Sequence, residues 1–275
     1  MREGLHFGTC GWSYIGPEEH EWVDIFYTTK SEILRQYFTY FDMVEINTTF
    51  YGPAKSNFVS HLVNEVDDKK FFTAKIPHQI THVHRLDMKT EAGVLMEEFF
   101  DSVRPLGERL QALLIQLPPW PLDSMSDLEE FLVNLDNSFR FAIEFRHDSW
   151  LTDSIMRLLE RYDICSVIVD EPKLPIILDL TSDFAYIRWH GHGTDIWYNY
   201  LYSMEELREW QERLESLLEE TKTVFGLFNN HFYANSIVNA FQMMELMGDI
   251  TPSQKAKLDR MNAQKAVRQT SIEDF

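Results

Sequence analysis

The sequence predicts an α/β protein of the (β/α)8 TIM-barrel class, a single domain followed by a polar C-terminal tail. Along the 275 residues, eight apolar runs of strand length alternate with amphipathic runs of helix length. Their spacing is close to the ~30 residues of a βαβ unit, and the chain is close to the ~250 residues typical of this barrel. A doubly wound open sheet is the alternative. We favour the barrel because it leaves no strand edge unpaired and because no Gly-rich phosphate loop follows the first strand.

The first half of the chain repeats a strand and a helix four times. Strands are expected over residues 5–9, 43–47, 71–76 and 112–117. Helices are expected over residues 31–40, 55–66, 92–108 and 127–134. Ser31 is the expected N-cap of the first helix, and Pro118 stops the fourth strand because proline has no N–H to donate.

The second half continues the alternation. Strands are expected over residues 139–145, 164–169, 184–189 and 223–228. Helices are expected over residues 151–162, 204–220 and 231–247, with only a short helix or turn after the sixth strand because of Pro172 and Pro175. The barrel domain is predicted to span residues 1–249. Residues 250–275 turn polar and are predicted to form a surface helix or a frayed end.

The charge balance restricts the class of partner. The formal charge is −19, from 25 Lys and Arg against 44 Asp and Glu, and a field of this sign repels phosphate backbones and anionic membranes. No run approaches the 18 apolar residues of a membrane span, and no signal peptide precedes the first strand. Cys10 and Cys165 lack metal-binding spacing and are expected to be reduced thiols. We expect a soluble cytoplasmic protein.

Polar and aromatic side chains gather where the predicted strands end. The stretch FRFAIEFRHDSW at residues 139–150 is the plainest example, because Glu144 and Arg146 follow directly on an apolar alternation. In a TIM barrel these carboxyl ends form the face that carries the active site. The candidate site residues at or beyond the strand ends are Trp12, Glu45, Asn47, Tyr51, Lys75, His82, Gln116, Glu144, Arg146, Asp170, Arg188, His190, Asn229 and Asn230.

These residue types indicate a receptor for a small anion. Lys75, Arg146 and Arg188 would bind a carboxylate or phosphate, because arginine presents two parallel donors and lysine a point charge. Glu45 and Glu144 could act as general acid and base. The alternative is that these charged groups only satisfy one another as ion pairs that fill the barrel. For Asn229 and Asn230, helix capping is the alternative.

A metal site is not expected. His190 and His192 have H-x-H spacing, but Gly191 between them is expected to start a turn that separates the two rings. A divalent metal held by these two histidines together with Glu144, Asp170, His147 or His231 stays the alternative. No other cofactor is implied.

Eight short motifs together resemble the YecE-like family, in the same order and over residues 5–245. They are GTCGWSY (8–14), VEINTTFY (44–51), ITH (80–82), LIQLPP (114–119), IEFRHDSW (143–150), VDEP (169–172), YIRWHG (186–191) and FNN (228–230). The resemblance implies a TIM-barrel fold and a domain of unknown function, without an established reaction. It also maps the family's polar signature onto the candidate residues above, with Trp150 in addition. A likeness of this family to endonuclease IV and sugar isomerase barrels is analogy.

We therefore expect an enzyme, a hydrolase or isomerase, that acts on a small anionic or polyhydroxylated substrate of the sugar phosphate or phosphoester class. Its expected catalytic residues are Glu45, Glu144, His190 and Asp170, with His190 as a proton shuttle. Substrate binding falls to Trp12, Asn47, Tyr51, Lys75, His82, Gln116, Arg146, Arg188, Asn229 and Asn230. One alternative is a metabolite-binding protein without turnover. The other is a metal-dependent phosphodiesterase like endonuclease IV, which the missing His, Asp and Glu ligands and the negative charge both disfavour. The oligomeric state is open.

Overall fold

The strands form two parallel sheets in the computed structural model, which describes residues 3–16 and 21–273. The first sheet contains, in spatial order, β1 (Leu5–Thr9), β9 (Val224–Phe228), β8 (Ala185–Trp189) and β7 (Ile168–Asp170). The second contains β2 (Met43–Ile46), β3 (Phe71–Lys75), β4 (Leu110–Gln116), β5 (Phe141–Glu144) and β6 (Ile164–Ser166). Every described strand pair is parallel. The predicted α/β class is thus confirmed.

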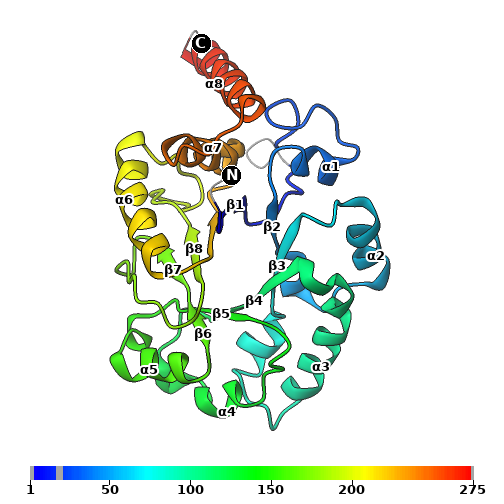
Figure 1. Cartoon of the computed structure of the whole chain (residues 1–275), viewed down its shortest axis with the longest axis vertical. Coiled ribbons are helices and arrows are strands. Elements are labelled where there is room, and N and C mark those ends of the chain that lie inside the picture. The colour runs from blue at the N-terminus through cyan, green and yellow to red at the C-terminus, as the bar shows by residue number, and fades with distance from the viewer. Residues whose placement is uncertain (1–2, 17–20, 274–275) are drawn as a thin grey trace.

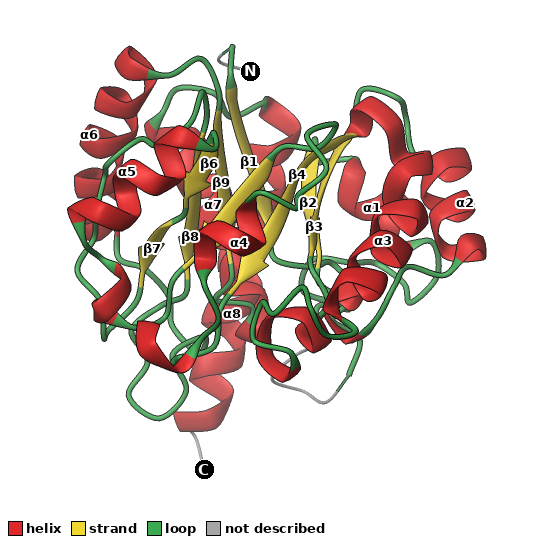
Figure 2. Cartoon of the chain, turned by 90° about the horizontal axis from the view of Figure 1, so that it is seen from below, coloured by secondary structure: helices red, strands yellow, loops and turns green. Residues whose placement is uncertain are grey.

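Helices connect most successive strands and lie around them (Figure 1), although no described helix stands between β6 and β7 or between β7 and β8. They are α1 (Ile33–Phe38), α2 (Ser56–Glu65), α3 (Ala92–Val103), α4 (Leu128–Leu132), α5 (Asp153–Arg161), α6 (Met204–Glu220), α7 (Asn235–Leu246) and α8 (Pro252–Glu273). Figure 2 shows the strands in the middle of the molecule, with α2 and α3 on one side and α5 and α6 on the other. All seven predicted helices are present, although most are shorter at one or both ends than expected.

Three helix boundaries differ from the prediction for identifiable reasons. Ser31 is not the N-cap of α1; that position is Glu32, which has φ 51° and no capping hydrogen bond. The α-helical part of α3 ends at Val103, and Pro105 follows in a 3-10 turn, where a ring without an N–H is tolerated. α7 begins at Asn235 because Tyr233, at φ 51°, interrupts the helical path before it.

The two sheets approach each other at two places. The predicted sixth strand is interrupted at Val167, so that β6 pairs with β5 while β7 pairs with β8. On the opposite side, Cys10 and Glu45 form an isolated parallel bridge between the ends of β1 and β2. Gly8 in β1 lies so close to β2 that a Cβ atom there would be 2.3 Å from the carbonyl oxygen of Met43. Glycine permits this backbone approach because it has no side chain.

Alternation along the strands separates an inner core from an outer one. In β8, Tyr186 belongs to the inner cluster, while Ile187 and Trp189 pack in the outer cluster beneath the helices. Both sheets contribute to the inner cluster, for example Leu114 from β4 and Leu227 from β9. Because side chains two residues apart share a face, polar residues that continue the inner alternation come together at the carboxyl ends of the strands.

The polar tail contains the long helix α8, which projects from the molecule beside α7 (Figure 1). Its first half is anchored, since Leu258 and Met261 are buried and the Gln254 amide donates to the Tyr40 carbonyl at 2.6 Å. Lys265 donates to Oδ1 of Asn235 at 2.5 Å. The tail as predicted runs on past residue 273, beyond the described residues, and the division at residue 249 stays a prediction. None of the described helices combines the length and the apolarity that crossing a bilayer requires.

Candidate functional site

A buried arginine on one sheet is paired with two glutamates on the other. One terminal nitrogen of Arg188, on β8, donates to Oε1 of Glu45 on β2 at 2.8 Å, and the other donates to Glu144 on β5. Both glutamates have no exposed surface, and Arg188 is 1% exposed. Ions this far from water are stable only when they are paired, so each of the three depends on the others.

Arg146 extends this set of ion pairs from Glu144 to Glu171. Its guanidinium donates to Glu144, to Oε2 of Glu171 at 2.6 Å and to Nε2 of His190 at 3.0 Å. We call the connected set of Glu45, Arg188, Glu144, Arg146 and Glu171 the ion-pair lattice. It contains three carboxylates and two guanidiniums, so both arginines already have carboxylate partners.

The lattice determines the charge state of Glu144. Burial by itself opposes ionisation, but the guanidiniums of Arg146 and Arg188 outweigh it and hold the pKa of Glu144 well below its usual range. A carboxyl group in this state has no proton to donate near neutral pH. The structure therefore favours an electrostatic role for Glu144 over the general-acid role expected from the sequence.

His190 is fully buried and stays neutral. Burial, together with the charge of Arg146, lowers its pKa to about 3. Nε2 lies 3.0 Å from a guanidinium nitrogen of Arg146, which donates to it, and Nδ1 lies 2.8 Å from the side-chain amide nitrogen of Asn229. The sequence had led us to expect that His190 shuttles a proton. A ring that stays neutral is unsuited to that role near neutral pH. It orients Arg146 instead.

Asp170 faces away from the lattice, into the outer core. Its two carboxylate oxygens accept from Nε1 of Trp210 on α6 and contact Nε2 of His192, each at 2.5 Å. Gly191, at φ 89°, makes the turn that sends His190 inward and His192 outward. The H-x-H pair therefore does not converge, and no group of three or more His, Cys, Asp or Glu side chains within the described ranges is placed to hold a metal ion.

Lys75 differs from the two arginines because no carboxylate of the described residues forms an ion pair with it. Nζ donates to Oε1 of Gln116 on β4 at 2.8 Å and lies 4.2 Å from the centre of the Phe50 ring. Lys75 is 8% exposed, and burial, reinforced by the positive charge of Arg188, lowers its pKa to about 8. Continued past Ile46 and Ala74, the parallel register of β2 and β3 brings Asn47 level with Lys75. The buried Oδ1 atom of Asn47 has no described hydrogen-bond partner.

Aromatic rings form one wall beside Lys75. His82 lies in the π-helical turn Gln79–Val83, with its ring centre 5.3 Å from that of Phe50 and 6.2 Å from that of Trp120. Burial and the nearby charge of Lys75 lower the pKa of His82 to about 4, so the ring is neutral. Trp120 in turn accepts a hydrogen bond at its carbonyl from Nε1 of Trp150, at 3.0 Å.

Several predicted site residues lie elsewhere. Trp12 stacks on Phe58 of α2 and lines a cavity of about 540 Å³ beside α1 and α2. Tyr51 is 77% exposed. Asn230 is buried, and its side-chain amide donates to the Tyr200 carbonyl at 2.9 Å. Neither Asn229 nor Asn230 caps a helix, because the N-cap of the 3-10 turn after β9 is His231.

The sequence analysis also missed residues that belong with the lattice. The Tyr186 hydroxyl donates to Oε2 of Glu45 at 2.7 Å and lies 2.8 Å from the hydroxyl of Thr73. Both precede a predicted site residue by two positions, Tyr186 before Arg188 and Thr73 before Lys75. The period of two along a strand was therefore the signal that could have found them.

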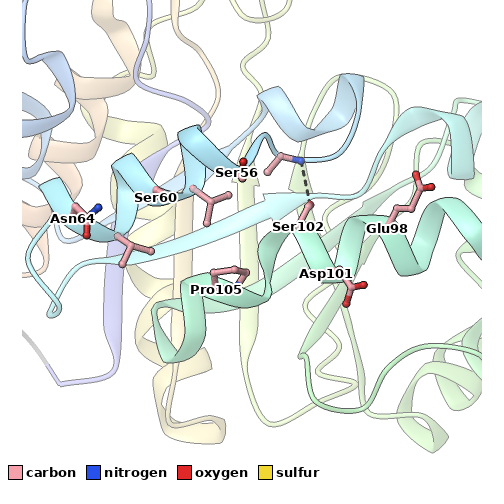
Figure 3. A pocket seen from close by; sticks show the side chains of 10 residues that line it. Ser56, Ser60, Asn64, Glu98, Asp101, Ser102 and Pro105 are labelled. Atoms are coloured by element: carbon pink, nitrogen blue, oxygen red, sulfur yellow. Dashed lines mark hydrogen bonds between the residues drawn. The ribbon is translucent and has the colours of Figure 1, made fainter.

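Three cavities on the described surface lie away from the lattice. The one in Figure 3 measures about 490 Å³ and lies between α2 and α3, where Ser56, Ser60 and Glu98 line it and the Ser102 hydroxyl accepts from the Ala54 amide at 3.1 Å. The others are beside α1 and α2 and at the amino ends of β5 and β6. None of the three is lined by Lys75 or by a lattice residue.

Comparison with known proteins identifies the family. A family model described as "Protein of unknown function DUF72" matches residues 6–263, which is most of the chain. This chain belongs to the DUF72 family. The match extends from β1 into α8, and the resemblance to YecE-like proteins stated from the motifs is confirmed.

Relatives of this DUF72 chain extend over nearly its whole length. UPF0759 protein YunF of Bacillus subtilis is 26% identical over 88% of this chain and 94% of the relative. UPF0759 protein YecE of Escherichia coli K12 is 24% identical over 76% of this chain and 82% of its own. The crystal structure of a DUF72 family protein from Thermotoga maritima matches with a TM-score of 0.76 and 30% identity, covering 89% and 99% of the two chains. A DUF72 family protein from Enterococcus faecalis, with a TM-score of 0.74 and 22% identity, shares the fold.

Proposed function

We propose that this DUF72 protein is an enzyme that acts on a small anionic or polyhydroxylated substrate, of the sugar phosphate or phosphoester class, at the carboxyl ends of its strands. The observation that supports this is Lys75, a nearly buried cation that has no carboxylate partner among the described residues and donates only to Gln116. A buried charge without a counter-ion is unfavourable, and an anionic ligand would relieve that cost.

The substrate would be held differently from the arrangement expected from the sequence. Arg146 and Arg188 are already paired with carboxylates, so the anion falls to Lys75. The free Oδ1 of Asn47 could accept from a substrate hydroxyl, and the neighbouring Phe50 ring offers an apolar face. A phosphate or carboxylate with hydroxyl groups nearby fits this set of one cation and one acceptor.

The catalytic roles follow from the protonation states. Glu144 is held as a carboxylate and His190 as a neutral ring, which leaves Lys75 as the group of this cluster whose pKa, about 8, suits proton transfer near neutral pH. We assign Lys75 the role of acid and base, and the lattice the role of positioning it. Asp170, bound to Trp210 in the outer core, supports α6.

We further propose that the two sheets close into an eight-stranded barrel, with β6 and β7 as one interrupted strand. The Cys10–Glu45 bridge and the close approach at Gly8 support closure between β1 and β2. The amide of Val167, which donates to the Ile143 carbonyl at 2.9 Å, supports continuity between β6 and β7. In such a barrel the lattice lies beneath the catalytic face.

A specific observation favours a second candidate, a metabolite-binding protein without turnover. The lattice is continuous from Glu45 to Glu171, and each of its charged groups has an oppositely charged partner, as expected of ions that only fill the interior. In this alternative the ligand still binds at Lys75. Turnover of the bound ligand separates the two candidates.

Thermal-shift titration with phosphorylated sugars, nucleotides and small carboxylates tests the proposal. A ligand at 100 times its Kd stabilises the fold by about 2.7 kcal/mol, which raises Tm by several degrees. We expect such a shift for the wild type and its loss in Lys75→Met. The matched control is Lys70→Met at the opposite end of β3, where Nζ donates to the Phe41 carbonyl at 2.9 Å, and it should keep the shift. A shift that survives in Lys75→Met would place the anion elsewhere, and no shift with any anion would overturn the proposal.

A further inference from the structure

We infer that Lys75 forms a reversible imine with its substrate, and that the substrate is therefore an anionic aldehyde or ketone, such as an oxo acid or the open-chain form of a sugar phosphate. The inference rests on the proposed function, because it assigns chemistry to the same anion site. It goes further in naming a covalent step and the carbonyl group that the step requires.

The contacts of the amine satisfy the first requirement for imine formation. A lysine held permanently in an ion pair with a carboxylate of the protein stays protonated and cannot attack a carbonyl carbon. Within the described chain, Nζ of Lys75 has no such partner, and its one hydrogen-bond partner is the neutral amide oxygen of Gln116. The Phe50 ring beneath the amine, 4.2 Å away, shields one side from water.

The charged groups around Lys75 leave part of the amine neutral at physiological pH. Glu45 on β2 and Glu144 on β5 favour the ammonium, whereas Arg188 on β8 and Arg146 beyond β5 oppose it. His82, from the turn after β3, is uncharged. Burial has the largest effect and lowers the pKa of Lys75 to about 8. At pH 7 about a tenth of such an amine is neutral. Lysines that form Schiff bases with their substrates are activated by a lowered pKa of this kind.

The step balances without an oxidant or a reductant. The nitrogen lone pair of Lys75 attacks the carbonyl carbon, and a proton moves from that nitrogen to the carbonyl oxygen to give a carbinolamine. The C–O bond then breaks, and the hydroxyl takes a proton from solvent and leaves as one molecule of water. The C=N bond that forms keeps the remaining proton on nitrogen, so the imine is cationic. Asn47 is level with Lys75 when the β2–β3 register is continued by one residue, and its buried Oδ1, an acceptor without a described partner, would accept from the carbinolamine hydroxyl. The nearby carboxylates of Glu45 and Glu144 would stabilise the cationic imine.

A second lysine separates the effect of the site from the effect of pKa alone. Burial also lowers the pKa of Lys265 to about 8, but its amine donates to Asn235 at the junction of α7 and α8. If neutral amine were sufficient, Lys265 would react as well as Lys75. If the site matters, Lys75 alone reacts at low probe concentration.

Borohydride trapping on the whole protein is the test. Wild type, Lys75→Arg, Lys265→Arg and Lys70→Arg are incubated at pH 7.5 with glyoxylate, pyruvate or glyceraldehyde 3-phosphate, and sodium borohydride then reduces any imine to a stable amine that peptide mass mapping locates. We expect at least tenfold more label on Lys75 than on Lys265 or Lys70 with one or more probes, and suppression by glycerol 3-phosphate, which lacks the carbonyl. The label should disappear in Lys75→Arg and persist in both controls.

The outcomes separate the inference from the proposed function. No trapping at Lys75, combined with a Lys75-dependent thermal shift by carbonyl-free anions, overturns the imine and leaves the anion site standing. Equal labelling of Lys75, Lys265 and Lys70 also overturns the imine inference, because it would show that the probes react with any amine. No trapping and no thermal shift overturn both. The wild-type map alone decides the location of the label, so the result does not depend on the folding of Lys75→Arg.

Discussion

Arg188 holds two glutamates away from water, and its removal should be costly. Arg188→Met would leave Glu45 and Glu144 without their shared counter-ion, and breaking a buried ion pair in this way costs about 3–5 kcal/mol of the free energy of unfolding. Denaturation in urea measures the loss. The control is Arg161→Met, which removes an exposed pair with Glu129 and should cost at most about 1 kcal/mol. Equal losses in the two variants would show that the lattice is not buried.

The lowered pKa of Glu144 predicts a pH dependence of stability with a definite sign. Because its pKa is below the ~4.3 of an unfolded glutamate, the carboxylate stabilises the fold above about pH 5, and this stabilisation is lost as the pH falls toward the folded-state pKa. Glu144→Gln should therefore be less stable than wild type at pH 7, by an amount that shrinks toward pH 3. Urea denaturation of both proteins between pH 7 and pH 3 gives this difference. A difference that is constant with pH would contradict the assignment.

At the scale of the element, the seam between β1 and β2 depends on one glycine. An added methyl group in Gly8→Ala would lie 2.3 Å from the Met43 carbonyl oxygen, so the two strands must separate. We expect a loss of several kcal/mol in the free energy of unfolding, comparable with overpacking of a core at about 1–3 kcal/mol or more. Gly16→Ala is the control, since a Cβ there meets nothing within 4 Å. A neutral Gly8→Ala would argue against closure at this seam.

The packing of α8 makes a separate prediction. Met261 is fully buried against the rest of the molecule, whereas its neighbour Asn262 is exposed. Met261→Ala should lower the free energy of unfolding by about 2–5 kcal/mol, and Asn262→Ala should change it by less than about 0.5 kcal/mol. Guanidinium denaturation compares them. If Met261→Ala is as stable as Asn262→Ala, the helix is not anchored where the structure places it.

The order of elements could be predicted from the sequence, but several of their ends could not. Strand positions followed from apolar runs bounded by Gly and Pro, which are local signals. The break at Val167 could not be predicted, because β6 and β7 form one continuous apolar run. They differ only in the neighbouring strand with which each pairs. The start of α7 was missed because the positive φ of Tyr233 has no signature in the residue type.

For the molecule as a whole, the sequence placed polar groups at one face but could not say which would pair. Alternation identified Glu45, Glu144 and Arg188 as candidates, and they do meet. It could not show that Arg146 is paired with Glu144 and Glu171 while Lys75 has no ion pair with any described carboxylate, because that depends on distances between strands far apart in the chain. Asp170 was assigned to the site although it has the parity of Ile164 and Ile168, which face the outer core, and not that of Val167 and Val169, which face inward.

The net charge gives a prediction at the same scale. A protein with a formal charge of −19 should repel polyanions, while a buried cation such as Lys75 can still bind a small anion. Fluorescence anisotropy with a labelled DNA duplex at about 50 mM salt should therefore show no binding, since binding to phosphate backbones rests on basic surface. Tight, salt-dependent binding would revive the phosphodiesterase alternative and contradict the small-anion site.

The reactivity of Lys75 as a function of pH tests the central claim most directly. Brief labelling with a trace of acetic anhydride, followed by mass spectrometry of the peptides, gives the fraction of each lysine that is neutral at each pH. The structure predicts that labelling of Lys75 rises with a midpoint at about pH 8, below that of exposed lysines. A midpoint near the ~10.4 of an ordinary lysine would contradict the account, because Lys75 would then be a fully charged group with no amine to offer a substrate.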